Sequence, residues 1–323
     1  MKKLQISYSD AYLDWKLGGG DGSHPTDPIR AKLAVEILEQ ELPSLGVEFE
    51  VTAPKFDLSS GSEDIKRLLQ VHSSAHVEEV LDRGTSGEWN GVSRSNARTA
   101  ALMFGGTVGL VDKMLAEDDS APRVAFNPQG AKHHAHRDYS SGFCVFNDMA
   151  WAALEFSAAG KKVVYIDWDV HAGDGVQAIL EDSNVATFSI HGHGIFPNLK
   201  YTSTRGETGN YLLMNAEKNW YNYNLQLGSG DLGFEWAVDS VISKAMEYEP
   251  DVILLATGAD GHASDHWGMN YTLGGYTMAA NKVAELALKF DASVLIGGAG
   301  GYQPHTWTPR IWADVVKTIA TAL

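Results

Sequence analysis

Three carboxylates and a histidine follow one short apolar run of the chain. Residues 163–166 read Val-Val-Tyr-Ile and lead directly into Asp167, Asp169, His171 and Asp174. Titratable groups at the end of a buried strand are costly unless a metal ion or hydrogen bonds hold them. Asp169 and His171 stand two residues apart, so in extended backbone their side chains point the same way and can bind one ion. Asp167 falls on that face too, where it can orient a histidine or join a second cation site; a solvated strand end is the rarer alternative.

Two adjacent imidazoles, His133 and His134, follow a second apolar run at residues 124–126. Beside a metal ion they could divide the work of hydrolysis. One could take a proton from water and return it to the leaving amine while the other stabilises charge, and a carboxylate partner would tune each of them. Taken alone, a histidine pair in a loop is more often a polar surface feature, so this interpretation depends on the neighbouring motifs.

Two further strand ends supply an aspartate and a tyrosine. Asp260 comes shortly after the apolar residues 252–256, where a distant metal ligand is expected. With the first two ligands it completes a set of two aspartates and one histidine that leaves a position open for water and substrate. Residues 294–296 lead into a glycine-rich turn before Tyr302, whose hydroxyl could hydrogen-bond the oxyanion that develops on a carbonyl beside the metal.

Apolar, β-branched runs alternate with amphipathic segments along the chain. The runs predict strands at residues 4–8, 47–51, 124–126, 163–166, 186–190, 252–256 and 294–296. The amphipathic segments predict helices at residues 30–42, 62–81, 94–115, 148–158, 234–247, 276–288 and 309–322. Strands joined by crossover helices predict an α/β fold with a central, mostly parallel sheet that helices bury on both faces, and the site of such a sheet lies beyond the carboxyl ends of its strands.

The segments between these elements show no repeat and no interdomain linker. Glycine-rich and polar stretches at residues 17–22, 84–92 and 199–209 indicate surface loops. We therefore expect a single catalytic domain over residues 1–323, since this length is ample for one large core.

The composition disfavours several classes of protein. The formal net charge is −16 and the isoelectric point is near 5.1, which disfavours binding to nucleic acid or anionic membranes and slightly favours cationic substrates such as amines. Cys144 is the single cysteine, so neither an intrachain disulfide nor a cysteine-rich zinc module can form. The sequence contains no apolar stretch of signal-peptide or membrane-spanning character, and we expect a cytoplasmic protein.

Taken in order, these motifs resemble those of the histone deacetylase superfamily, particularly its bacterial acetoin-utilisation-type and deacetylase-like amidohydrolase branches. The resemblance runs from His24 to Arg310. Its motifs are His-Pro-x-x-Pro-x-Arg at residues 24–30, the paired histidines, Ser-Gly-Phe-Cys at 141–144, Asp-x-Asp-x-His-x-Gly-Asp-Gly at 167–175, Gly-Ala-Asp at 258–260, and the glycine run before Tyr302.

The resemblance implies an arginase/deacetylase-type fold and a zinc-dependent amidohydrolase that acts on linear amides. The implied zinc ligands are Asp169, His171 and Asp260. By the same resemblance, His134 would act as general base and acid with Asp174 as its partner. His133 with Asp167 would give electrostatic support, and Tyr302 would polarise the scissile carbonyl.

The resemblance also implies a substrate channel and a second cation. Phe143 and Phe196 match the aromatic pair that walls the family's narrow channel, and Gly142 lies beside them. Arg30 matches the family arginine near the exit for acetate. A structural potassium ion would lie near Asp167, Asp169, His171 and Ser189.

The sequence departs from the family pattern at the mouth of the channel. Asp265-His266-Trp267 stand where the family usually has Asp-Pro-Leu or a near variant. Acetylpolyamine-selective relatives place a glutamate at the equivalent of Trp267, so its absence makes that substrate less favoured. A tryptophan could still hold a cation on its ring face, narrow the opening, or simply pack on a loop.

The leading interpretation is hydrolysis of an acetyl or other short acyl amide, which releases acetate and a free amine from acetyl-lysine or a small acetylated amine. An acetylpolyamine amidohydrolase and a weakly catalytic protein that binds or reads acyl groups are the alternatives. An arginase-like ureohydrolase would need two manganese ions and further aspartates, and Gly173-Asp174 after His171 fits one metal better. The sequence leaves the acyl acceptor and the oligomeric state open.

Overall fold

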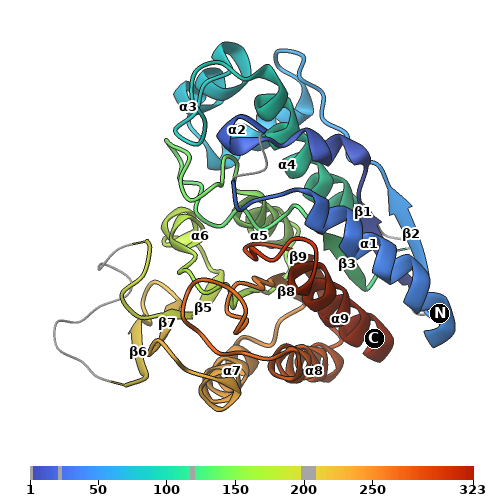
Figure 1. The fold of residues 1–323 in the computed structure, drawn as a ribbon, viewed down its shortest axis with the longest axis vertical. Helices are drawn as coiled ribbons and strands as arrows, with labels where there is room; N and C mark the ends of the chain where they lie inside the picture. The colour runs from blue at the N-terminus through green and yellow to red at the C-terminus, as the bar shows by residue number, and fades with distance from the viewer. Residues whose placement is uncertain (1–2, 21–23, 117–120, 198–208) are drawn as a thin grey trace.

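A nine-stranded sheet runs through the protein (Figure 1). The computed structural model describes residues 3–20, 24–116, 121–197 and 209–323. The strands are β1 (Lys3–Ser7), β2 (Glu48–Thr52), β3 (Val124–Asn127), β4 (Val163–Asp167), β5 (Ala186–Gly192), β6 (Tyr211–Asn215), β7 (Trp220–Leu225), β8 (Val252–Ala256) and β9 (Ser293–Gly297). They lie in the order β2-β1-β3-β9-β8-β4-β5-β7-β6. Every neighbouring pair is parallel except β6 with β7.

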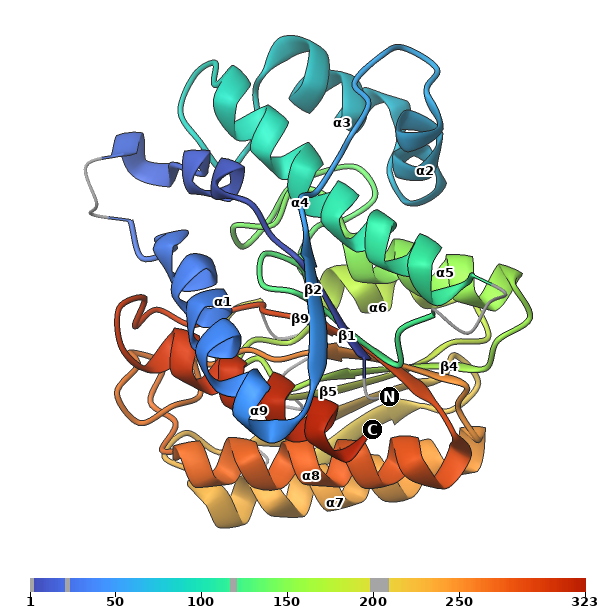
Figure 2. The same cartoon turned by 90° about the vertical axis from the view of Figure 1, so that its right-hand side faces the viewer.

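Helices cover both faces of the sheet (Figure 2). They are α1 (Ile29–Glu41), α2 (Glu63–Val71), α3 (Ser74–Glu78), α4 (Arg94–Met114), α5 (Asp148–Ala158), α6 (Asp174–Leu180), α7 (Asp231–Ala245), α8 (Leu273–Phe290) and α9 (Trp307–Ala322). One layer contains α1, α9, α8 and α7, and each of these helices packs against the next in that order. The other layer contains α4, α5 and α6, which pack in the same way. None of these helices, in the part of the chain that the structure describes, combines the length and apolar content needed to cross a bilayer.

Alternate residues of the central strands enter opposite cores. In β8, Ile253 and Leu255 pack in the core beneath α7, α8 and α9, whereas Val252 and Leu254 pack in the core beneath α4 and α5. Successive side chains of a strand point to opposite faces, so a strand covered on both sides must be apolar at every position. This explains the continuous apolar run of β8 and fixes the carboxyl ends of the parallel strands at one edge.

Every predicted strand lies in this sheet, with ends within two residues of the predicted ones. The predicted α/β fold, with a mostly parallel sheet between two helical layers, is confirmed. Most predicted helices are also present, and α5 has the predicted bounds.

The prediction of one helix over residues 62–81 is wrong. The chain forms α2, breaks at His72, and continues as α3 and a π-helical turn at Glu79–Arg83. Tertiary contacts hold the break. The Nδ1 atom of His72 lies 2.9 Å from the carbonyl oxygen of His136, and its Nε2 atom accepts a hydrogen bond of 2.9 Å from the Asn147 N–H.

The sequence analysis missed three elements, β6, β7 and α6. β6 alternates between exposed and half-buried residues, and β7 carries Asn222 and Asn224, which are polar but buried. The side chain of Asn222 donates to Gln177 at 2.9 Å, and that of Asn224 lies 3.1 Å from His191 Nε2, so tertiary hydrogen bonds make these polar residues acceptable in a strand. α6 is only seven residues long and begins at Asp174, which gives it almost no periodic signal.

Two of the predicted loops contain more order than expected. Residues 17–20 form a short 3-10 helix, Leu17–Gly20. The stretch 84–92 is a loop, but its Trp89 is buried and donates from its indole N–H to the Gly84 carbonyl at 3.0 Å. The third predicted loop, 199–209, lies outside the described residues except for Gly209.

Replacement of His72 by glutamine tests the cost of burying this imidazole. Burial, reinforced by neighbouring His76, lowers the pKa of His72 from 6.5 to about 3. Between those two pH values the His72 imidazole is protonated in the unfolded chain and neutral in the folded chain. The free energy of unfolding therefore decreases as the pH falls from about 6.5 to 3, by up to about 1.4 kcal/mol per pH unit. In urea unfolding measured at steps of pH, we expect His72→Gln to lose about 1–3 kcal/mol at pH 7 and to show a shallower acid dependence. His305→Gln, at an exposed site, is the control; parallel acid slopes for His72→Gln and wild type would contradict the assignment.

Candidate functional site

Loops that follow four adjacent strands meet at the carboxyl edge of the sheet. β3, β9, β8 and β4 are consecutive neighbours. In that order, the segments that follow them carry His133 and His134, then Tyr302, then Asp260, then Asp169 and His171. Motifs that lie far apart in the sequence are therefore close in space because parallel strands end at the same edge.

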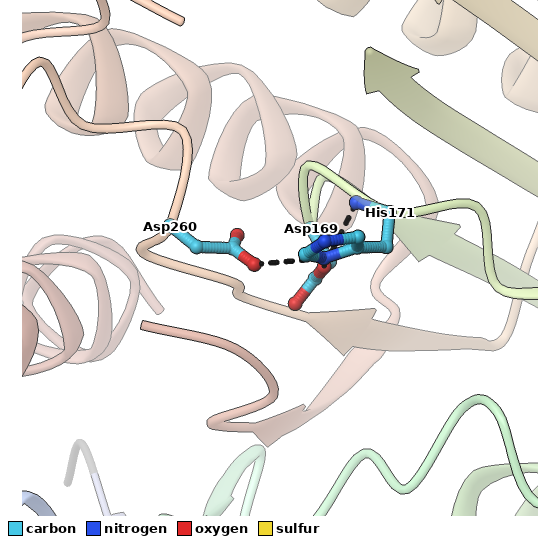
Figure 3. Close-up of side chains that lie close together, drawn as sticks. All are labelled: Asp169, His171 and Asp260. Carbon is cyan, nitrogen blue, oxygen red and sulfur yellow. Dashed lines mark hydrogen bonds and ion pairs between the residues drawn. The ribbon is translucent and has the colours of Figure 1, made fainter. Parts of the chain in front are cut away.

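Asp169, His171 and Asp260 converge on one point, with Asp260 reaching across from its own loop (Figure 3). One donor atom from each lies within 4.8 Å of the others, and all three side chains are buried. The Nδ1 atom of His171 lies 3.0 Å from Asp169 Oδ1 and 3.1 Å from Asp260 Oδ2. The extended-strand explanation for this convergence is wrong, because β4 ends at Asp167 and both Asp169 and His171 stand in the loop that follows.

Backbone N–H groups hold the two carboxylates in place. Val170 N–H donates to Asp260 at 3.0 Å, and Gly300 and His171 donate to the two oxygens of Asp169 at 2.6 and 2.9 Å. Gly300 is close enough that a Cβ there would lie less than 3.0 Å from both carboxylates. Gly300, two residues before Tyr302, is thus required by the close packing of the Asp169–His171–Asp260 cluster.

The charges of this cluster fit a divalent cation. Burial, together with the neighbouring charge of Asp169, raises the pKa of Asp260 to about 7. Burial alone would lower the pKa of His171, but its hydrogen bonds to the two aspartates outweigh this effect and raise the pKa to about 10. The two carboxylates thus favour a positively charged group between them. Two carboxylates and one imidazole are a donor set that zinc accepts, as do other divalent ions.

The paired histidines have separate carboxylate partners. The Nδ1 atom of His133 lies 2.7 Å from Asp167, and that of His134 lies 2.6 Å from Asp174. Burial lowers the pKa of His133, but Asp167 reverses this effect and the pKa rises to about 9. Burial and the charge of His133 lower the pKa of His134 to about 4. At neutral pH the His133 imidazole is therefore protonated and cationic, whereas the His134 imidazole is neutral.

The sequence analysis missed His136. Its Nε2 atom lies 3.0 Å from the second oxygen of Asp174, so this carboxylate serves two imidazoles. Burial would raise the pKa of Asp174, but hydrogen bonds from His134 and His136 hold it well below its usual range. The only sequence signal was a third histidine two residues after the pair, and spacing alone does not show which histidine reaches the carboxylate.

Tyr302 projects from the glycine-rich turn into the same region. Its backbone N–H donates to Asp265 at 2.8 Å, a contact that the sequence analysis did not foresee. Its ring lies 6.0 Å from Trp267 and 6.3 Å from Phe143. Burial and the charge of Asp260 raise the pKa of the hydroxyl well above its usual value, so it stays protonated and can donate a hydrogen bond.

Aromatic rings surround the histidines. Phe196 lies 4.9 Å from the ring of His134, and Trp267 stands edge-on to His171 at 4.4 Å. A Cβ on Gly142 would lie less than 3.0 Å from the His134 ring, so only glycine leaves room for this imidazole. Trp267 is half-buried and packs against His171, one of the candidate metal ligands.

A cavity of about 30 Å³ adjoins this cluster, with Arg30, Lys132, His134, Asp169 and Tyr302 among its lining residues. Arg30 is buried and donates to the Gly301 carbonyl oxygen. The role that the resemblance implies for Arg30, an arginine near the exit for acetate, stays a prediction. Lys132 was not singled out by the sequence analysis.

The expected potassium site remains a prediction. Asp167 and Ser189 stand in register on β4 and β5. The hydroxyl of Ser189 accepts a hydrogen bond of 3.4 Å from the Gly173 N–H and lies 2.8 Å from His191 Nδ1.

Comparison with known proteins identifies the family. The model of the histone deacetylase domain matches residues 24–319. The chain belongs to the histone deacetylase family. Human histone deacetylase 1 is 34% identical over 208 residues, which cover 62% of this chain and 40% of that protein. The acetoin utilization protein AcuC of Staphylococcus aureus is 28% identical over 340 residues, which cover 98% of this chain and 82% of AcuC.

A solved structure supports the fold of this family. The crystal structure of the HDA15 HD domain aligns with a TM-score of 0.78 at 24% identity and covers 98% of this chain and 88% of that one. The predicted arginase/deacetylase-type fold is thereby confirmed. The chain spans only 40% of the length of the histone deacetylase 1 relatives that it matches.

Substitution of Gly300 by alanine tests whether the Asp169–His171–Asp260 cluster holds zinc, without removing any of the three candidate ligands. Its methyl group would press on both Asp169 and Asp260, so we expect zinc affinity to fall about 10- to 100-fold, the range seen when groups that position metal ligands are changed. The measurement is competition with a chromophoric chelator. Gly109→Ala, in an exposed helical position with open space around it, is the matched control and should bind zinc normally. Unchanged affinity in Gly300→Ala would refute the packing argument.

Proposed function

We propose that this member of the histone deacetylase family hydrolyses short acyl amides with the help of zinc, and that its substrate is an acetyl-lysine side chain or a small acetylated amine. The observation that carries the proposal is the buried Asp169–His171–Asp260 cluster beside a histidine of lowered pKa. The Asp2His donor set suits zinc, which would polarise the scissile carbonyl and help water to lose a proton. We also propose that residues 1–323 act as one catalytic domain.

In this proposal His134 moves the proton. It is neutral near pH 7 because its pKa is about 4. Asp174 lies 2.6 Å from Nδ1 and accepts a hydrogen bond from it, which leaves Nε2 as the proton acceptor. His134 takes a proton from water as the water oxygen bonds to the carbonyl carbon. It returns that proton to the nitrogen as the carbon–nitrogen bond breaks, so the amine leaves in a stable form.

His133 and Tyr302 act on the negative charge of the reacting carbonyl. His133 is cationic at neutral pH, since Asp167 raises its pKa to about 9 despite burial. The Tyr302 hydroxyl is protonated and lines the same cavity as His133 and His134. A hydrogen bond from this hydroxyl to the carbonyl oxygen would strengthen as charge develops there.

The aromatic groups favour a linear substrate. Phe143 lies near the Tyr302 ring, and Phe196 lies near the His134 ring, so the two phenylalanines flank the proposed reaction site. Trp267 packs edge-on against His171, beside the candidate metal ligands. An unbranched acylated amine chain fits between such walls better than a branched one does.

Acetate release by the zinc-loaded protein tests this function. The panel contains acetyl-lysine peptides, acetylpolyamines and small acetylated amines. We expect chelation to abolish turnover, and His134→Ala and Tyr302→Phe each to lower kcat by about 100-fold or more because they remove proton transfer and oxyanion stabilisation. His266→Ala, at an exposed position, should retain activity.

The outcomes of this panel separate the candidate functions. Preference for acetylpolyamines would reassign the substrate. Tight acyl-ligand binding by the zinc-loaded protein without turnover would replace hydrolysis by an acyl-binding role.

A further inference from the structure

Asp174, the carboxylate partner of His134, is held by side chains alone. Its Oδ1 atom lies 2.6 Å from His134 Nδ1, and its Oδ2 atom lies 3.0 Å from His136 Nε2. Among the described residues, no backbone N–H group and no hydroxyl donates to this carboxylate. Each of its two oxygens therefore has one partner, and both partners are imidazoles.

Neighbouring carboxylates of the site have donors that cannot move away. The backbone N–H of Asp169 donates to Asp167 at 2.9 Å, and the backbone N–H of Gly300 donates to Asp169 at 2.6 Å. Such bonds fix the direction in which a carboxylate points, because the backbone of a packed loop stays in place. In the described part of the chain Asp174 has no donor of this kind, so its orientation depends on the two imidazoles.

One of these imidazoles changes during the proposed reaction. His134 is neutral before it takes a proton from water and cationic afterwards, and a hydrogen bond from a charged donor is roughly twice as strong as one from a neutral donor. The bond between His134 and Asp174 therefore weakens and strengthens in each turnover. His136 supplies a second donor, on the other oxygen, that takes no part in this exchange.

The backbone of His136 is anchored by a distant segment. The Nε2 atom of His72, at the break between α2 and α3, accepts the Asn147 N–H, so its Nδ1 carries the proton and donates to the His136 carbonyl oxygen at 2.9 Å. The N–H of His136 donates to the Tyr139 carbonyl at 3.0 Å. The rings of His136 and Tyr139 stack with their centroids 4.5 Å apart. These contacts hold His136 in place independently of Asp174.

His136 lies at the outer end of this row of contacts. The exposed fraction of the side chain rises from 4% for His134 to 8% for Asp174 and 15% for His136. Tyr139, which stacks on His136, is 54% exposed. The carboxylate thus lies mostly out of water, where solvent competes little for its hydrogen bonds and each donor has a larger effect.

We propose that His136 is a positioning residue for proton transfer. It fixes the second oxygen of Asp174, so that the first oxygen stays on Nδ1 of His134 and the Nε2 atom of His134 faces the water. This role rests on the proposed function, in which His134 is the general base. In the described structure His136 does not line the cavity beside the Asp169–His171–Asp260 cluster, so it acts through Asp174 alone.

Steady-state kinetics of the zinc-loaded protein test this role with the best substrate of the acetyl-amide panel. We expect His136→Leu to lower kcat about tenfold, the lower end of the range for groups that orient a reacting side chain, with KM and zinc affinity unchanged. His136→Gln, which keeps an N–H donor at the position of Nε2, should restore most of kcat. Lys162→Met is the matched control, because it removes an exposed donor from Glu249 at the opposite end of β4.

A double-mutant cycle with Asp174→Asn tests the route of the effect. If His136 acts through Asp174, His136→Leu should lower kcat in the wild-type background and leave it unchanged in the Asp174→Asn background. Equal losses of kcat in both backgrounds, or a loss that is matched by a loss of zinc affinity, would overturn the proposal. If His136→Leu does not fold, His136→Asn replaces it, since its shorter side chain places the donor away from the position of Nε2.

NMR of the histidine ring nitrogens tests the positioning without turnover. The signals of His134 are identified by their loss in His134→Ala. We expect a single tautomer, with the proton on Nδ1 of His134, in wild type and His136→Gln, and a mixture of both tautomers in His136→Leu. A single tautomer in His136→Leu would refute the proposal. Because no substrate is present, this result stands whether or not the panel shows turnover, so failure of the proposed function is distinguishable from failure of this role.

Discussion

The whole site depends on keeping two like charges close together away from water. Asp169 and Asp260 are almost fully buried and approach the same histidine. Their repulsion in a medium of low dielectric constant must be offset by backbone donors and by a cation. The donors come from the neighbouring loops, and these loops must pass so close that Gly258 and Gly300 have no room for a side chain. The glycine content of the strand ends follows from this constraint.

Buried carboxylates next to the cluster also need partners, and they find them in the paired histidines and their neighbours. Asp167 also accepts a hydrogen bond of 2.7 Å from the Tyr165 hydroxyl and holds His133 in its cationic form. Asp174 is shared between His134 and His136, and His134 remains neutral beside the positive charge of His133. Two adjacent histidines thus differ in protonation because their surroundings differ. Such a difference lets the two side chains take different chemical roles.

Charge is also divided across the cavity. Its lining residues include the carboxylate of Asp169 as well as the buried cations Lys132 and Arg30. A hydrolase of acyl amides produces an acid and an amine, which carry opposite charges. In the proposed reaction, a cavity that presents both kinds of charge would meet both products, whereas the aromatic walls around Phe143 and Phe196 would meet the uncharged chain.

Local sequence was sufficient for seven of the nine strands, for most of the helices, and for the three residues of the Asp169–His171–Asp260 cluster. Short, continuous apolar runs favour strands that are covered on both faces. The polar groups that follow β4 and β8 stand at the sheet edge where parallel strands end. Residue type and order also indicated the family. The contacts of His136 and Asp265 and the burial of Lys132 were decided by tertiary structure, since each depends on another segment of the chain. The break at His72 and the polar strand β7 have the same cause: hydrogen bonds between distant segments outweigh local propensity, and no local pattern encodes them.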